Sequence, residues 1–133
     1  MSQSLLEDVL VRFVLAWREG RSSDIEGLLD DEVIWQGLRG DYICRNRKEA
    51  MEIVRPSLGR MGLGDHLEIL MHGQQVVLGL GAPDFRKLGD VPIDSQIFQV
   101  FNFRDGKVVR ILEYKTRQEA LVAAERPDRS EWR

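Results

Sequence analysis

One carboxylate in the sequence stands where an acid or base could act on a bound molecule. Glu113 alternates with Val109 and Ile111 in a β-prone run, so the three side chains are expected on one face of a strand. Two apolar neighbours indicate that this face points into the protein. Burial in apolar surroundings raises a carboxyl pKa and suits the group to general acid–base catalysis. Glu113 is therefore our catalytic candidate, the alternative being an edge carboxylate paired with an arginine or lysine.

A glutamine lies on an apolar strand face shortly before it. Gln99 alternates with Ile97, Phe101 and Phe103. A buried amide must find a hydrogen-bond partner. That partner could be a ligand, or it could be backbone or water in an ordinary core, and the sequence leaves both readings open.

Aromatic residues could line an apolar cavity. The candidates are Phe13, Trp17, Trp35 and Tyr42. Because an aromatic stripe at helical spacing is usually core, we expect Phe13 and Trp17 in the core with one edge at the cavity. Trp35 directly precedes Gln36, so strict alternation points the two side chains to opposite faces unless a bulge intervenes.

Residue types that bind metals or attack substrates are few. His66 and His72 are the only histidines, and six strand residues separate them by about 20 Å. They cannot share a metal within one strand, and we predict neither a metal nor a cofactor. Cys44 is the single cysteine, so no intramolecular disulfide can form, and a reducing, cytoplasmic location is the simpler interpretation. With neither histidine near it in sequence, Cys44 is predicted to be a small buried or half-buried residue and not a nucleophile.

Length and composition set the broad class. A chain of 133 residues fits one domain, and 43% hydrophobic with 31% charged residues is typical of a globular protein. The net charge of −3 argues against nucleic acid as the main partner, because phosphate binding needs a basic surface. No apolar run is long enough to span a bilayer, so we expect a soluble protein that does not enter a membrane.

The candidate residues are carried by a regular series of predicted elements. Capping boxes and helical periodicity predict helices at residues 4–19, from Ser23, from Asn46 and at 118–125. β-prone runs predict strands at 33–35, 66–72, 75–80, 95–103 and 107–115, with Asp105–Gly106 as a hairpin turn and a loop at 82–92. This order predicts an α+β domain, in which a curved antiparallel sheet wraps around the N-terminal helices and leaves an internal pocket.

Three segments together are similar to a known superfamily. They are the helix end at Trp17–Gly20, the run LLDDEVIWQG at Leu28–Gly37 and the run FQVFNFRDGKVVRILEYKTRQEAL at Phe98–Leu121. The chain resembles the nuclear transport factor 2-like superfamily, in particular its SnoaL-like polyketide cyclase and ketosteroid isomerase branches, and also limonene-epoxide hydrolase. The resemblance implies a cystatin-like, cone-shaped single domain over residues 1–125, with 126–133 as a polar tail. Such folds serve isomerases, hydrolases, cyclases and non-catalytic modules, so the fold does not define the function.

The family's functional residues can be compared position by position. The tyrosine, base and protonated acid of ketosteroid isomerases fall at Phe13, Gln36 and Gln99, none of which titrates at neutral pH. The catalytic residues of that isomerase are therefore not matched. The last aspartate of the epoxide hydrolases falls at Glu113, but their Arg-x-Asp pair would fall in the uncharged run QVVLGL at residues 75–80.

The resemblance implies an apolar pocket for a small lipophilic molecule. Its expected ligand-contacting residues are Phe13, Trp17, Trp35, Gln36, Tyr42, Gln99 and Phe101. Three hypotheses follow: an isomerase, cyclase or epoxide-hydrolase-like enzyme that uses Glu113, a pocket that binds without reacting, or an association module. The resemblance also implies a homodimer through the open face of the sheet. The predicted outward apolar set on that face is Phe98, Val100, Leu112 and Tyr114.

Overall fold

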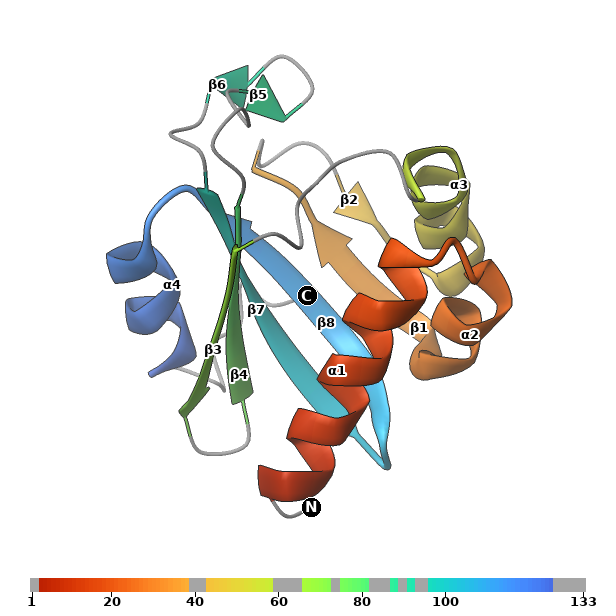
Figure 1. Cartoon of the computed structure of the whole chain (residues 1–133), viewed down its shortest axis with the longest axis horizontal. Helices are drawn as coiled ribbons and strands as arrows, with labels where there is room; N and C mark the ends of the chain where they lie inside the picture. The colour runs from red at the N-terminus through yellow and green to blue at the C-terminus, as the bar shows by residue number, and fades with distance from the viewer. Residues whose placement is uncertain are drawn as a thin grey trace.

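The computed structural model describes residues 3–38, 43–58, 66–72, 75–81, 87–88, 91–92 and 96–125 (Figure 1). Its helices are α1 (Gln3–Arg18), α2 (Ser22–Leu28), α3 (Arg47–Ser57) and α4 (Arg117–Ala124). Its strands are β1 (Leu29–Gln36), β2 (Ile43–Cys44), β3 (His66–His72), β4 (Gln75–Gly81), β5 (Lys87–Leu88), β6 (Val91–Pro92), β7 (Gln96–Arg104) and β8 (Lys107–Tyr114). Tyr42 and the predicted tail, 126–133, lie outside the described residues.

Six strands form one open, curved sheet in the order β2-β1-β8-β7-β4-β3. The meander from β3 to β8 is antiparallel, as the sequence predicts, but β1 pairs with β8 in parallel. A parallel pair needs a long connection between its strands, and the residues between β1 and β8 provide one. The α+β class and the curved sheet are thus confirmed, with the correction that the sheet is mixed.

The inner face of this sheet is the one that α1 crosses (Figure 1). The helix buries an apolar stripe against alternate residues of the strands. The stripe and its partners include Leu6, Val9, Leu10 and Phe13 from α1, and Val76, Leu78, Phe101 and Ile111 from the strands. Spacings of three and four along α1 put its members on one side, as helical geometry requires.

The outer face is covered by α4, which returns over β4, β7 and β8 after the last strand (Figure 1). Ala120 and Ala124 pack there against Phe98, Val100 and Leu112. These three strand residues are buried within the chain itself, so the apolar surface that we expected them to offer to a partner is not exposed. Helix α4 has eight residues, and its buried side chains are the small Ala120 and Ala124. The sequence therefore carried no strong apolar pattern to indicate that this helix covers the sheet.

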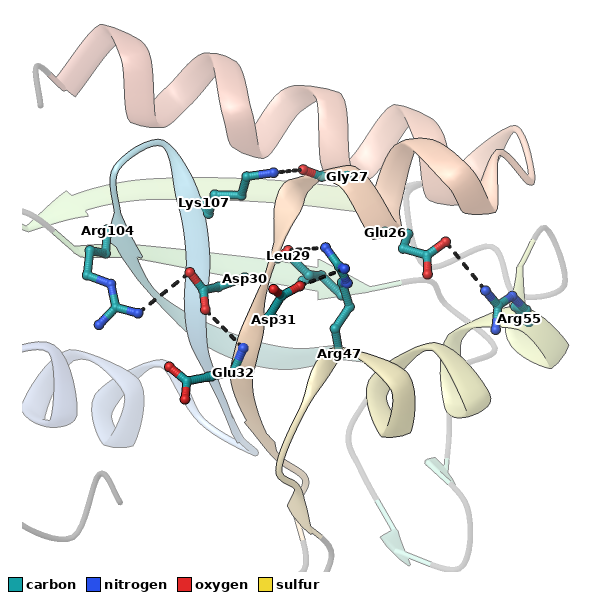
Figure 2. A network of polar contacts seen from close by, with 10 residues as sticks. All are labelled: Glu26, Gly27, Leu29, Asp30, Asp31, Glu32, Arg47, Arg55, Arg104 and Lys107. Atoms are coloured by element: carbon teal, nitrogen blue, oxygen red, sulfur yellow. Dashed lines mark hydrogen bonds and ion pairs between the residues drawn. The ribbon is translucent and has the colours of Figure 1, made fainter.

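The first strand begins earlier than predicted. Leu29, Asp30 and Asp31 belong to β1, although the two aspartates interrupt the apolar pattern. Figure 2 shows how they are held: Arg47 pairs with Asp31 at 2.6 Å, and Arg104 approaches Asp30 at 3.6 Å. These pairs join the start of β1 to α3 and to the end of β7.

The predicted helix starts are correct for α3 and displaced for the first two helices. The Asn46 side chain accepts a hydrogen bond from the Glu49 amide at 2.9 Å, which is the expected N-cap. Helix α1 begins at Gln3, one residue before the predicted capping serine. Helix α2 begins at Ser22 after Arg21, which makes no side-chain capping bond, so the predicted cap at Ser23 is wrong.

Two smaller findings complete the fold. Within the predicted loop at 82–92, β5 and β6 pair with each other in antiparallel orientation as a separate two-stranded sheet. The hairpin turn at Asp105–Gly106 is confirmed, with positive φ angles of 53° and 79°. Within the described residues, no helix has the length and apolar character needed to cross a membrane.

Candidate functional site

One carboxyl oxygen of Glu113 accepts hydrogen bonds from two neutral side chains. Gln99 lies directly across from it, on β7, and its Nε2 donates to Glu113 Oε2 at 2.8 Å. The indole Nε1 of Trp35, on β1, donates to the same oxygen at 3.1 Å. Among the described residues, no basic side chain pairs with Glu113.

The parallel pairing of β1 with β8 brings Trp35 to this carboxylate. Trp35 lies opposite Ile111, and therefore on the inner face. Its neighbour Gln36 lies opposite Leu112, whose side chain belongs to the outer-face cluster. The structure thus brings Trp35 and Gln99 together at Glu113 and leaves Gln36 on the other face. Leu29, Val33 and Trp35 all belong to the inner core, so β1 alternates regularly through the register shift between Leu29 and Ile34.

Burial raises the pKa of Glu113 above the usual range for a glutamate. Hydrogen bonds from Gln99, from Trp35 and from the backbone of Leu38 act in the opposite direction, because they favour the carboxylate, but they do not cancel the desolvation. The residue as a whole is half-buried, although protein atoms surround its carboxyl group densely. The group therefore holds its proton to higher pH than an exposed glutamate.

Trp35, which donates to the Glu113 carboxyl group, belongs to a cluster of four aromatic rings. Phe13, Trp17 and Trp35 form a triangle with ring centroids 6.3–6.4 Å apart. Phe101 meets Phe13 edge-on at 5.5 Å. We call these four residues the aromatic wall. Its members come from α1, β1 and β7, so the structure gathers four of the residues that the sequence suggested for a ligand pocket.

The two indoles of the aromatic wall differ in their hydrogen bonding. Trp35 Nε1 is bonded to Glu113, whereas Trp17 Nε1 is buried and has no hydrogen-bond partner among the described residues. Buried donors are normally paired, so an unpaired one calls for an explanation.

Cys44 borders the same region, which the sequence did not predict. It pairs with Trp35 across β1 and β2 and is buried in the inner core. Burial raises the pKa of its thiol, and the nearby carboxylates of Glu49, Glu113 and Glu52 raise that pKa further. A thiol in this setting stays protonated, which agrees with the expectation that Cys44 is not a nucleophile.

The two histidines lie at opposite ends of one strand. His66 and His72 are the first and last residues of β3. Within the described part of the chain, no three His, Cys, Asp or Glu residues are grouped so that they could hold a metal ion.

Comparison with known proteins agrees with this architecture. No protein-family model and no curated protein sequence matches the chain. Solved structures do match it. An LEH-like epoxide hydrolase from M. tuberculosis is 18% identical, with a TM-score of 0.60 over 91% of this chain and 95% of that one. A candidate ketosteroid isomerase from Kribbella flavida is 13% identical, with a TM-score of 0.64 over 85% and 78%.

A designed protein shares the same architecture. This de novo protein with a curved β-sheet is 16% identical, with a TM-score of 0.65 over 94% of this chain and 96% of that one. Other matches are NTF2-like proteins of unknown function, among them one from Mesorhizobium loti with a TM-score of 0.68. The chain therefore has the nuclear transport factor 2-like fold, and at these identities the likeness concerns the fold alone.

Proposed function

We propose that the chain is a small enzyme that binds a lipophilic molecule against the aromatic wall and uses Glu113 as its acid–base group. One observation carries this proposal: a half-buried carboxyl group with a raised pKa is oriented by two neutral donors, one of which, Trp35, belongs to the aromatic wall. A perturbed carboxyl group next to apolar surface is a recurrent mark of catalytic sites.

The donors around Glu113 support a proton-transfer role. Neither the Trp35 indole nor the Gln99 amide titrates at neutral pH, so any proton exchanged with a ligand here belongs to Glu113. Because its pKa is raised, the group can begin a reaction as an acid and later accept a proton as a base. Opening of an epoxide, isomerisation of a ketone and cyclisation all use such a group.

The structural neighbours support these reaction classes without selecting one. The M. tuberculosis protein is an epoxide hydrolase, and the Kribbella protein is a candidate ketosteroid isomerase. By resemblance, Phe13, Gln36 and Gln99 fall at the three positions that titrate in ketosteroid isomerases. An isomerase reaction here would therefore depend on Glu113 alone.

Substitution of Glu113 tests the proposal. We would assay limonene 1,2-oxide and 5-androstene-3,17-dione with the wild type, with Glu113→Gln and with Glu7→Gln, an exposed carboxylate of α1 as the matched control. Loss of general acid–base catalysis should lower the turnover of an accepted substrate about 10²- to 10⁴-fold in Glu113→Gln and leave Glu7→Gln unchanged. Full turnover by Glu113→Gln would refute the catalytic role.

A non-reacting binding pocket is the second candidate. The observation in its favour is that Glu113 is well supplied with donors, as a purely structural carboxyl group would be. Thermal stabilisation by these compounds without any turnover would support binding alone.

Self-association and cytoplasmic location remain proposals as well. A dimer formed through the sheet would have to include the exposed side of α4, because α4 covers Phe98, Val100 and Leu112. Sedimentation at micromolar concentration distinguishes a monomer of 15.3 kDa from a dimer.

A further inference from the structure

Among the described residues, one buried polar side-chain atom on the inner side of the sheet lacks a hydrogen-bond partner. Glu113, Gln99 and Trp35 satisfy one another through Glu113 Oε2. Of the four buried side-chain atoms that lack a partner in the described residues, three belong to Gln75 and Asn102. Gln75 and Asn102 lie opposite each other on β4 and β7. They stand two residues from the outer-face pair of Val77 and Val100, so they belong to the outer face as well. The fourth atom is Trp17 Nε1, which belongs to the inner side.

We propose that Trp17 Nε1 is the hydrogen-bond donor for the ligand, so that the site selects a neutral lipophilic molecule with an acceptor oxygen. This inference rests on the proposed binding of such a molecule at the aromatic wall, and it adds the chemical feature that the molecule must carry. Ketones and epoxides meet the requirement, and a hydrocarbon of the same shape does not.

The chemistry of the indole defines the ligand atom. An indole N–H donates and cannot accept, so its partner must be an acceptor. Trp17 stands in the last turn of α1, and its ring lies 6.4 Å from that of Trp35, the residue that donates to Glu113. Trp17 is therefore a direct neighbour of the residue that holds the carboxyl group. A neutral oxygen is favoured over an anion, because apolar rings solvate charge poorly and an ionised Glu113 would repel it.

The unpaired N–H of Trp17 should make the preference for an oxygen-bearing ligand measurable. A buried N–H without a partner weakens the free protein, and a ligand oxygen removes that defect when it binds. A hydrocarbon fills the same space and leaves the N–H unpaired. One neutral hydrogen bond corresponds to about a fivefold to tenfold preference for the oxygen-bearing ligand.

Two ligand pairs test this inference, each with and without one carbonyl oxygen. We would measure the Kd of camphor and bornane, and of 5α-androstan-3-one and 5α-androstane, for the wild type, Trp17→Phe and Glu113→Gln. The wild type should prefer the ketone of a pair about fivefold to tenfold. Trp17→Phe should bring the ratio close to one and keep the affinity for the hydrocarbon within about twofold, which also shows that this variant is folded. Glu113→Gln should keep the preference.

Nuclear magnetic resonance gives a second measurement. The indole N–H signal that Trp17→Phe removes should move downfield when the ketone is added and should move much less with the hydrocarbon. Equal affinities for ketone and hydrocarbon in the wild type would overturn the donor role and leave the proposed pocket standing. A preference lost in Glu113→Gln but kept in Trp17→Phe would assign the donor to the Glu113 carboxyl group instead. Binding of neither pair would overturn the pocket and this inference together.

Discussion

Two buried glutamines on neighbouring strands should respond in opposite ways to the same substitution. Gln75, on β4, is 2% exposed, and neither its Nε2 nor its Oε1 has a partner in the described residues. Gln99, on β7, is 4% exposed and donates to Glu113 at 2.8 Å. Methionine has a similar length and volume and needs no partner, so Gln→Met removes the amide and largely keeps the packing.

The magnitude follows from the hydrogen bonds that are present or missing. A buried polar group without a partner costs about 1–3 kcal/mol, so Gln75→Met should raise the free energy of unfolding by about 1–2 kcal/mol after small packing losses. Gln99→Met removes a donor from the Glu113 carboxyl group and should lower that free energy by about 1–3 kcal/mol. The same chemical change thus separates the two variants by roughly 2–5 kcal/mol.

Urea unfolding followed by tryptophan fluorescence measures both values. Unchanged m-values would show that the variants expose the same surface on unfolding. If Gln75→Met were destabilised by more than about 1 kcal/mol, the Gln75 amide would have to be paired in solution, and the reasoning would be refuted. Equal losses in both variants would show that the substitution itself disturbs the sheet.

Three further predictions concern pH, capping and packing. Because the folded pKa of Glu113 is raised, its protonated form stabilises the fold at low pH, and this contribution should disappear as pH rises through the folded pKa. Thermal unfolding of the wild type should show this loss, and Glu113→Gln should lack it. Asn46→Ala removes the cap of α3 and should cost about 1 kcal/mol in urea unfolding, while a loss below about 0.3 kcal/mol would contradict the capping bond. A Cβ at Gly79 would lie 2.8 Å from Phe98 Cε2, so Gly79→Ala should cost about 1–3 kcal/mol, and an unchanged Tm would show that the ring moves aside freely.

Local patterns in the sequence predicted most of the elements. The N-cap at Asn46, the turn at Asp105–Gly106 and the strands β3, β4, β7 and β8 follow from capping, turn chemistry and alternation within a few neighbouring residues. The inward direction of Glu113 was predicted from Val109 and Ile111. Ile111 does share the inner face, but the register shift between Asn102 and Phe103 places Val108 and not Val109 in the inner core.

The relations between distant segments could not be predicted in this way. Trp35 reaches Glu113 because β1 docks in parallel on β8 after a register shift, and neither the docking nor the shift has a local signal. Neighbouring strand residues point to opposite faces, so alternation alone could not tell whether Trp35 or Gln36 faces the carboxyl group. The covering of Phe98 by α4 depends on the direction in which the chain returns after β8, which composition does not specify.

The same parallel docking has a consequence for the order in which the site is assembled. The Gln99–Glu113 bond joins residues 14 positions apart within one hairpin, whereas the Trp35–Glu113 bond spans 78 positions. Contacts between distant positions form slowly, because the chain must close a large loop before they contribute. The carboxyl group and its amide donor can therefore come together early, and the indole can join only when the N-terminal third of the chain reaches the last strand. A folding intermediate with a formed β7–β8 hairpin would thus contain Glu113, Gln99 and Phe101. It would lack Trp35 and the rest of the aromatic wall.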